Sequence, residues 1–316
     1  MNDPSPGAPM VSVITAAYNR SNVLRYAIES LLANTFSDWE LLAVDDASTD
    51  DTRKLVTSFN DPRIRLIALP RNTGEQSGPN NQGFCAARGR YIAYLNQDDL
   101  WFPDHLDKAV AELERTGAAW VFTLSLTVLP SGQSTIEGLL PGGRYHPRYG
   151  KHVPATLWVL RREVLEEIGE WRSYRRLHLS PSQDLLRRGW RAGKDIRMVR
   201  ALTAILVPSG SRPGVYAERQ WQENAELRRR MIEEPGLRER LLLDALLTLG
   251  ARVARDTADP GFAFRNLLVS LARRTAALLG MHPLAVEALR RGLRRGSLVE
   301  SLRRTRGLPP GRRPES

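Results

Sequence analysis

Apolar and polar positions alternate in two different rhythms over the first hundred residues, and this pattern predicts alternating strands and helices. Short apolar and β-branched runs predict strands at residues 11–17, 39–44, 64–68 and 91–95. Apolar residues at helical spacing predict helices at residues 23–32, 52–59 and 83–87. Strands that alternate with helices form βαβ units, so we expect an α/β fold with a mainly parallel sheet flanked by helices. The carboxyl ends of parallel strands share one edge, which is where such sheets bind ligands.

The pattern becomes less regular in the second hundred residues and is almost wholly helical after Pro213. The further elements that it predicts are a helix at residues 103–116, strands at 119–129 and 155–160, helices at 162–168 and 182–192, and a pair of short strands at 196–207. Residues 130–152 are rich in Gly, Pro, Tyr and basic residues and show no periodicity, which predicts a functional or mobile loop. We therefore expect a flexible leader at residues 1–9, an α/β domain at 10–210 and a helical, Arg-rich extension at 211–316.

Composition excludes several classes of protein. The chain has 316 residues, of which 42% are hydrophobic, and a single cysteine, Cys85. These values exclude disordered, collagen-like and disulfide-stapled proteins. The first residues lack the basic start and apolar core of a signal peptide, and no run of about 18 apolar residues follows. We therefore expect a soluble protein of the cytoplasm.

The net charge of +11 is concentrated in one segment. Residues 262–316 contain 12 Arg and three Glu, a charge of +9, so only +2 remains for residues 1–261. A nearly neutral body, and a tail without aromatic residues between its arginines, do not favour a nucleic-acid-binding protein. Leucines and arginine pairs at near-helical spacing in the tail are typical of a helix that binds an anionic membrane surface. In a cytoplasmic protein that surface would be the inner face of the membrane. A helical extension that packs on the α/β domain or on a second copy has the same pattern, and the sequence leaves both open.

Two pairs of acidic residues follow predicted strands. Asp45 and Asp46 come directly after one strand, and Asp98 and Asp99 come shortly after another. Adjacent carboxylates repel each other, and crowding them costs free energy unless a cation or hydrogen-bond donors compensate the charge. An isolated pair is usually a turn or a helix cap, but two pairs at one sheet edge favour a ligand site. Asp50 and its neighbour Asp51 fit a capping box with the preceding hydroxyl residues, so we expect them to cap a helix.

The chain resembles the family 2 glycosyltransferases, which have the GT-A nucleotide-sugar-binding fold. The segments that carry the resemblance are residues 11–20 (VSVITAAYNR), 44–50 (VDDASTD), 71–74 (RNTG), 81–83 (NQG), 87–92 (ARGRYI) and 95–101 (LNQDDLW). Each segment alone is weak, but their order and spacing over about ninety residues are specific. The resemblance implies that residues 10–210 form a GT-A catalytic domain.

The resemblance also implies roles for individual residues. Residues expected to bind the nucleotide are Ala17, Tyr18, Asn19 and Arg20 against the base, Asp46 with Asp45 beside it on the base or ribose, Asn72, and Asp98 on the ribose or on metal-bound waters. Asp99, with Asp98, is expected to hold Mg²⁺ or Mn²⁺ on the diphosphate, because such ions accept few protein ligands and complete their shell with phosphate oxygens. The usual first acid of this motif is replaced by Asn96. Arg88 is either a diphosphate contact or a solvated helix residue.

Inverting transfer needs a base that takes the proton of the acceptor hydroxyl. In the family this base is an Asp near a helix start, and the match here is Asp184, preceded by Gln183 instead of the usual acid. A helix-capping role for Asp184 and a base role for His178 are the alternatives. Trp158 and Trp171 lie in the segment that resembles the acceptor-facing part, where they would either stack on a sugar or pack in the core. His178 also belongs to this acceptor side.

The implied activity is inverting, metal-dependent transfer of a sugar from a nucleotide-diphosphate sugar to a hydroxyl of a glycan or lipid-linked acceptor. Cell-envelope or exopolysaccharide synthesis is the expected setting. Two alternatives remain: a catalytically silent nucleotide-sugar-binding protein, and a nucleotidyltransferase on a similar fold. The second is disfavoured because the loop after the first strand lacks the Gly-rich, basic pattern of that class.

Overall fold

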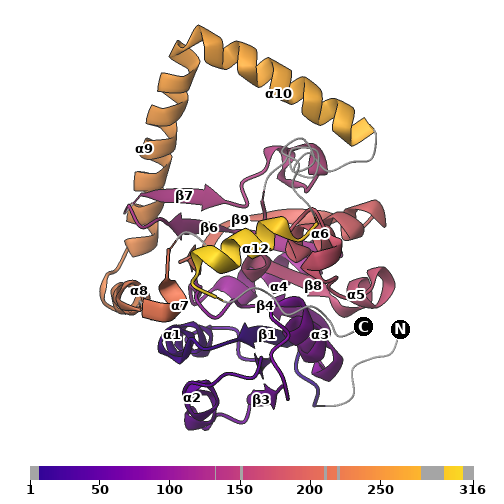
Figure 1. Ribbon diagram of the computed structural model, residues 1–316, viewed down its shortest axis with the longest axis vertical. Helices are drawn as coiled ribbons and strands as arrows, with labels where there is room; N and C mark the ends of the chain where they lie inside the picture. Colours follow the sequence, from indigo (N-terminus) through magenta and orange to yellow (C-terminus); the bar gives the residue numbers. More distant parts are fainter. Residues whose placement is uncertain are drawn as a thin grey trace.

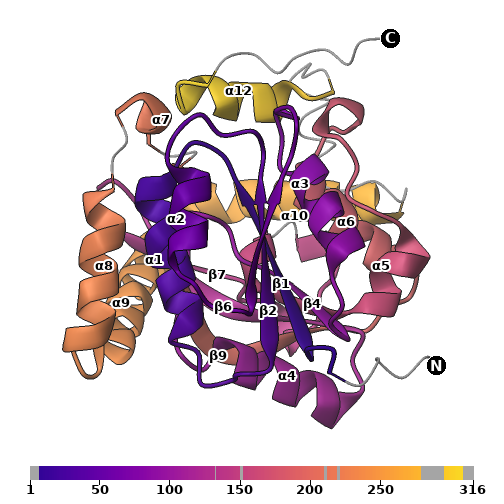
Figure 2. The same cartoon turned by 90° about the horizontal axis from the view of Figure 1, so that it is seen from below.

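The computed structural model describes residues 7–131, 133–149, 152–209, 212–218, 221–278 and 295–308. Its first half is a parallel sheet with the order β3-β2-β1-β4. The strands are β1 (Val11–Ala17), β2 (Trp39–Asp45), β3 (Ile64–Ala68) and β4 (Tyr91–Tyr94). The connecting helices are α1 (Ser21–Leu32), α2 (Thr52–Ser58) and α3 (Ser77–Ala86), and they flank this sheet (Figure 2). Each of the four strands was predicted to within one residue at either end.

The second half of the sheet is mixed, so the sheet as a whole is parallel only in part. It contains β8 (Trp158–Arg161), β6 (Trp120–Val128), β9 (Ile196–Leu206), β5 (Leu100–Trp101) and β7 (Ser134–Glu137). β6 and β9 pair in parallel, whereas β8 is antiparallel to both β4 and β6. The short β5 pairs antiparallel with β9, and β7 pairs antiparallel with β6. The α/β fold class is confirmed, with a sheet of nine strands among the described residues.

Several expectations for this half are corrected. Residues 196–206 form one continuous strand rather than two short ones, and residues 155–157 form a 3-10 turn before β8 begins. The loop expected at 130–152 contains β7, followed by 3-10 turns at Pro141–Gly143 and Pro147–Tyr149. The remaining helices of this part are α4 (His105–Thr116), α5 (Arg162–Ile168) and α6 (Pro181–Arg191), with a 3-10 turn at Tyr174–Arg176.

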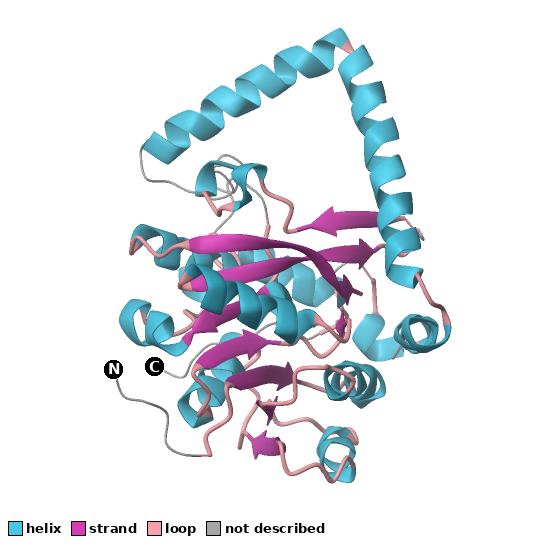
Figure 3. Ribbon diagram, turned by 180° about the vertical axis from the view of Figure 1, so that it is seen from behind, coloured by secondary structure: helices cyan, strands magenta, loops and turns pink. Residues whose placement is uncertain are grey.

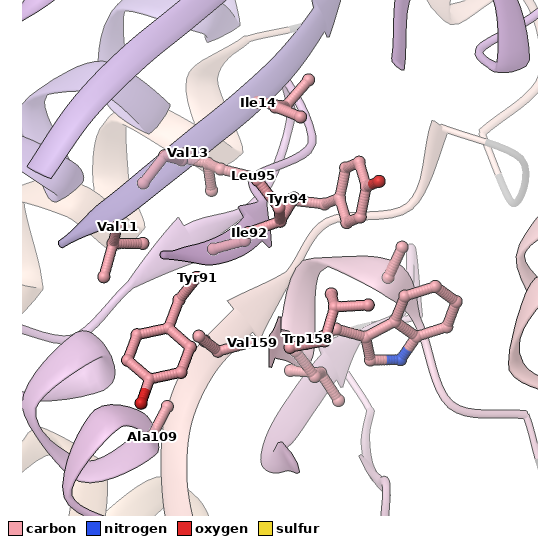
Figure 4. Packing of buried hydrophobic residues seen from close by; sticks show 14 of the residues in the cluster. Val11, Val13, Ile14, Tyr91, Ile92, Tyr94, Leu95, Ala109, Trp158 and Val159 are labelled. Atoms are coloured by element: carbon pink, nitrogen blue, oxygen red, sulfur yellow. The ribbon is translucent and has the colours of Figure 1, made fainter. Parts of the chain in front are cut away.

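The core lies against both faces of the sheet. β1 and β2 are almost continuously apolar because helices cover them on both sides. Aromatic side chains fill the centre: Trp158 meets Tyr94 edge-on at 6.4 Å between ring centroids (Figure 4). Trp158 also meets Trp120 edge-on, at 4.8 Å between ring centroids. Such edge-to-face pairs stabilise the core beyond their buried area. These ring contacts join β4, β8 and β6 in the middle of the sheet.

The extension after the sheet is helical where the structure describes it. Its helices are α7 (Val215–Glu218), α8 (Gln222–Glu233), α9 (Leu237–Ala258), α10 (Pro260–Leu278) and α12 (Ser297–Thr305). Leu227 of α8 packs in one small apolar cluster, and Ala245 of α9 packs on Leu126 and Leu202 in another. Beyond these contacts α9 runs away from the sheet and α10 turns back above it (Figures 1 and 3). α12 returns to lie across the loops that follow the strands (Figure 2).

Among the described residues, no helix has both the length and the apolarity that crossing a bilayer requires.

One buried histidine makes stability depend on pH. His105 begins α4, its ring stacks on Trp101 at 4.0 Å, and its Nδ1 lies 2.8 Å from the Thr203 hydroxyl of β9. Burial lowers the pKa of His105 from its ordinary 6.5 to about 3. The folded protein therefore keeps this ring neutral where the unfolded chain would protonate it.

We expect this group to destabilise the protein as the pH falls below 6.5. Its contribution is complete above pH 6.5 and is lost by about 1.4 kcal/mol for each pH unit below that value, down to about pH 3. Urea unfolding at pH 7.5 and pH 5.5 should show a larger loss for the wild type than for His105→Phe, which keeps a flat ring against Trp101. Equal losses in the two proteins would show that His105 is protonated in the folded state.

Candidate active site

A pocket of about 510 Å³ opens at the carboxyl ends of β1, β2 and β4. This is the edge at which the sequence places the acidic pairs. The carboxylate residues that line the pocket are Asp46, Glu75, Asp98, Asp99 and Glu137. The site therefore concentrates negative charge, and its chemistry depends on what compensates that charge.

The loop after β1 forms one wall through its first residues. Ala17 and Tyr18 line the pocket, and the Tyr18 N–H donates to Gln97 Oε1 at 2.9 Å. Gln97 Nε2 donates in turn to the Tyr216 hydroxyl at 2.8 Å, and the rings of Tyr18 and Tyr216 lie 6.4 Å apart. These contacts hold the Tyr18 and Tyr216 rings together in the pocket wall, where the resemblance implies that the nucleotide base binds.

Asn19 and Arg20 support this wall from behind and do not line it. Asn19 has a left-handed backbone (φ 48°), which Asn tolerates better than most residues. Its Oδ1 accepts the Thr49 N–H at 2.7 Å, and its own N–H donates to the Ser48 hydroxyl at 3.0 Å. The Arg20 guanidinium is buried and lies 5.2 Å from the centre of the Tyr216 ring. Both residues therefore position the loop.

The pair after β2 divides into two roles. Asp45 is fully buried, accepts the Ser48 N–H at 3.0 Å and forms an ion pair with Arg53, so it holds the turn and does not reach the pocket. Asp46 lines the pocket and accepts from the Thr73 N–H at 2.8 Å and from Asn72 Nδ2 at 3.0 Å. Burial raises the pKa of Asp46, and the hydrogen bonds from Thr73 offset only part of this shift. Asp46 and Asn72 therefore come together, as the sequence predicts.

Asp98 and Asp99 meet the end of β9. Asp99 is only 2% exposed; its Oδ2 accepts from Asn96 Nδ2 at 2.7 Å, and its Oδ1 accepts from the Val207 N–H at 3.3 Å. Burial, and after it the charge of Asp98, raise the pKa of Asp99 well above its usual value. Asp98 accepts the Ser209 N–H at 3.3 Å. Where the family motif usually has a third carboxylate, Asn96 instead supplies an amide that donates a hydrogen bond to Asp99.

These two carboxylates fit a hard divalent cation. They are adjacent oxygen donors whose mutual repulsion raises the cost of ionising Asp99, and a cation would remove that cost. Within the described ranges, no group of three or more His, Cys, Asp or Glu side chains is arranged around a metal position. A cation here would thus take its other ligands from phosphate oxygens and water, as Mg²⁺ commonly does.

Asp184 lies at the start of α6, next to the pocket. The helix is capped by Ser180, whose hydroxyl accepts the Gln183 N–H at 3.4 Å, so the cap is Ser180 and not Asp184. Asp184 Oδ2 accepts from Arg188 Nε at 2.9 Å. The first residues of this segment, Ser180 to Ser182, line the pocket, whereas Asp184 and His178 do not. The structure therefore brings Asp184 close to the site but leaves it ion-paired.

The expected acceptor contacts of the two tryptophans are wrong. Trp158 and Trp171 are buried in the main core and stack on each other at 5.9 Å between ring centroids. The Trp171 Nε1–H donates to the Tyr94 hydroxyl at 2.8 Å. Since neither ring lines the pocket, neither can stack on a sugar there. The core alternative holds for both.

Two other polar groups have structural roles. Arg88 forms an ion pair with the buried Glu40 of β2 at 2.9 Å, so it is neither a diphosphate contact nor simply solvated. Asp50 accepts from the Thr52 N–H at 3.0 Å at the start of α2 and from the Ser21 N–H at 3.1 Å at the start of α1. The capping prediction is confirmed for Asp50, whereas the Asp51 side chain makes no cap hydrogen bond.

The C-terminal extension contributes a wall that sequence reasoning missed. Its lining residues are Tyr216, Val299, Leu302, Arg303, Arg306 and Leu308. Arg303 is 8% exposed and its Nη1 donates to the Gly74 carbonyl, while the Tyr174 hydroxyl donates to Glu300. α12 thus packs on the α/β domain, which is one of the two alternatives for the tail. In the sequence, the pattern of leucines and arginines predicts an amphipathic helix here, but it does not indicate which surface that helix packs against.

A comparison with known protein families identifies the family of the part of the chain that carries the acidic pairs. The profile described as Glycosyl transferase family 2 matches residues 12–169, which is half of the chain. The chain belongs to glycosyltransferase family 2. The match ends at the residue that stops α5, so α6 and the extension lie outside it.

Relatives of this family 2 glycosyltransferase match about a third of its sequence. The succinoglycan biosynthesis protein ExoO of Rhizobium meliloti is 44% identical over 119 residues, which are 37% of this chain and 34% of ExoO. The putative teichuronic acid biosynthesis glycosyltransferase TuaG of Bacillus subtilis is 36% identical over 117 residues, 36% of this chain and 46% of TuaG. The matches thus span about a third to a half of the length of these relatives.

A solved structure supports the fold of the family 2 enzyme. Residues 1–349 of S. aureus TarS, in complex with UDP-GlcNAc, superpose with a TM-score of 0.57 at 18% identity, covering 75% of this chain and 71% of TarS 1–349. At this identity the likeness shows the GT-A fold alone.

Proposed function

We propose that this family 2 glycosyltransferase moves a sugar, with inversion, from a nucleotide-diphosphate sugar to a hydroxyl of a glycan or lipid-linked acceptor. Cell-envelope or exopolysaccharide synthesis is the proposed setting. The observation that carries the proposal is the pocket at the carboxyl edge of the sheet, where Asp46 and the Asp98–Asp99 pair come together. Relatives named for succinoglycan and teichuronic acid biosynthesis, and the UDP-GlcNAc complex of TarS, support it.

In this proposal the β1 and β2 loops bind the nucleoside. Tyr18, Asp46 and Asn72 line the pocket together, and the Asp46 carboxylate is fixed by the Thr73 N–H, so its position does not depend on the ligand. Asp98 and Asp99 would hold Mg²⁺ or Mn²⁺. When bound, that ion would neutralise charge on the diphosphate leaving group.

We propose Asp184 as the base. In the transfer, the acceptor oxygen forms a bond to the anomeric carbon, its proton passes to the carboxylate, and the bond from the sugar to the diphosphate breaks. The ion pair with Arg188 orients the Asp184 carboxylate beside the pocket. Glu137, at the end of β7, is the competing candidate because it lines the pocket directly.

Metal-dependent release of nucleoside diphosphate tests the activity. Incubated with a panel of nucleotide sugars, the wild type should release nucleoside diphosphate with Mg²⁺ or Mn²⁺ and stop with EDTA. Asp99→Asn should reduce the rate by roughly 100-fold, because the cation loses a buried ligand. Asp51→Asn is the control, since that exposed carboxylate makes no cap hydrogen bond. Tight donor binding without any turnover would favour the silent binding protein, and full activity in EDTA would exclude the metal.

The same assay separates the two candidate bases, with water taking the place of the acceptor hydroxyl. Asp184→Asn should slow release by about 100-fold or more with unchanged donor affinity, because a general base contributes about that much. In Glu137→Gln the rate of release should stay within about threefold of the wild-type rate, because in this proposal Glu137 takes no proton. The reverse result would assign the base to Glu137.

We further propose that α10 holds the enzyme on an anionic membrane at its cytoplasmic face. Phe264, Leu267, Leu268 and Leu271 recur at the spacing of one helix face, and each is more than half exposed. The sequence of α10 has three arginines and no acidic residue. An apolar helix face in a basic segment is what binds such surfaces, and a lipid-linked acceptor would lie at the same surface.

Flotation with vesicles tests this placement. The wild type should float with phosphatidylglycerol–phosphatidylcholine vesicles and stay behind with phosphatidylcholine alone. The double variant Phe264→Asp/Leu268→Asp should lose about tenfold or more of its binding, because it puts charge on the apolar face. Point substitutions are preferred to truncation, which would also remove α12. If the variant floats as well as the wild type, α10 is not the membrane contact.

A further inference from the structure

The pocket has an imbalance of charge that the proposed donor makes worse. Five carboxylate residues line it, of which Glu75 is ion-paired with Arg175 at 3.2 Å, and a nucleotide diphosphate would add further negative charge. A single divalent cation compensates only part of this sum. Among the described residues, the Arg and Lys side chains that line the pocket are Arg303 and Arg306. Both come from the extension, one within α12 and one directly after it.

Contacts at both ends of α12 fix it in place. The Gly296 N–H donates to the Leu177 carbonyl at 2.9 Å before the helix, and the Thr305 carbonyl accepts the Gly214 N–H at 2.8 Å at its end. The Tyr174 hydroxyl donates to Glu300 in between. These partners belong to the segment before α6 and to the loop at the start of α7. The helix is therefore held by the same loops that surround the pocket.

The two arginines approach the parts of the site that bind the proposed donor. Arg303 Nη1 donates to the carbonyl of Gly74, and Gly74 directly follows the Thr73 that Asp46 holds. The Arg306 carbonyl accepts the Tyr216 N–H at 3.1 Å, which places Arg306 beside the Tyr18–Tyr216 pair. Arg306 Nε is buried and has no hydrogen-bond partner among the described residues. A buried guanidinium nitrogen without a partner costs free energy, and an anionic ligand would supply the acceptor.

We propose that α12 supplies the cationic half of the donor site, with Arg303 and Arg306 binding the diphosphate of the nucleotide sugar. This inference rests on the proposed function and assigns a further part of the same site. Guanidinium groups suit this role because they form paired, charge-assisted hydrogen bonds to phosphate oxygens. They would also stabilise the charge of the nucleoside diphosphate as it leaves. The donor site would thus be completed by a helix more than 200 residues along the chain from Asp46.

Comparing a nucleotide with its nucleoside tests the role of the arginines specifically. The affinity of the full chain for UDP, GDP and dTDP is measured by calorimetry in the presence of Mg²⁺. Each is compared with the affinity for the matching nucleoside, which is uridine, guanosine or thymidine. Arg303→Gln and Arg306→Gln should each lower the affinity for the diphosphate that the wild type binds by roughly 10- to 100-fold. Nucleoside affinity should stay unchanged. Arg304→Gln, which removes the same charge from the exposed side of the same helix, should match the wild type in both.

Two further variants guard against a misfolded helix. Arg306→Gln keeps the Arg303–Gly74 hydrogen bond, and Arg303→Lys keeps the charge, so neither should release α12; Arg303→Lys should lose less affinity than Arg303→Gln. An unchanged ratio of diphosphate to nucleoside affinity in the Gln variants would overturn the proposal. Tighter diphosphate binding in those variants would also overturn it, since α12 would then block the pocket. If the wild type binds none of the three diphosphates, the proposed function fails and this inference with it.

Discussion

The buried carboxylate of Asp99 is the constraint on which the site depends. It lies between β4 and β5, beside a second acid, and is almost completely buried. Its charge must be compensated by the protein or by what the protein binds. The Asn96 amide and the Val207 N–H supply two hydrogen bonds, but these leave the pKa of Asp99 well above its usual value. The proposed Mg²⁺ or Mn²⁺ would lower the cost of ionising this carboxylate.

The second half of the fold serves the same requirement. The residues just after β9 bring the Val207 and Ser209 N–H groups to the Asp98–Asp99 pair, and β9 reaches this edge because it runs parallel to β6. α12 then brings Arg303 and Arg306 over the other side of the pocket. A parallel first half supplies the acids, and later, non-local elements supply the donors and the positive charge.

Local patterns in the sequence predicted most of the sheet and part of the site. Strands such as β1 are buried on both faces and produce an apolar run with clear ends, so their bounds were predictable. The two-residue β5 and the partly buried β7 lack such a run, and each depends on pairing with another strand. Asp46, Asp98 and Asp99 were predicted to lie together because strand ends share an edge, whereas Asn72 was expected only from the resemblance to the family. Trp158 and Trp171 were misplaced because an aromatic residue has the same appearance in a core and in a sugar site.

The docking of α12 could not have been predicted from spacing. Leucines and arginines at helical intervals describe an amphipathic helix, and only tertiary contacts such as Arg303 with Gly74, 229 residues apart, show what it covers. The same pattern in α10 stays exposed, so the tail divides between two environments. The other leucines and arginine pairs of this pattern, within residues 279–294, lie outside the described residues.

Hydrogen–deuterium exchange of the full chain, with and without the nucleoside diphosphate that binds and Mg²⁺, tests most directly whether the strand ends and α12 form one donor site. We expect simultaneous protection of four segments: residues 44–47, 72–76, 96–99 and 297–306. Protection of the three strand-end segments with unchanged or faster exchange in residues 297–306 would contradict a donor site completed by α12.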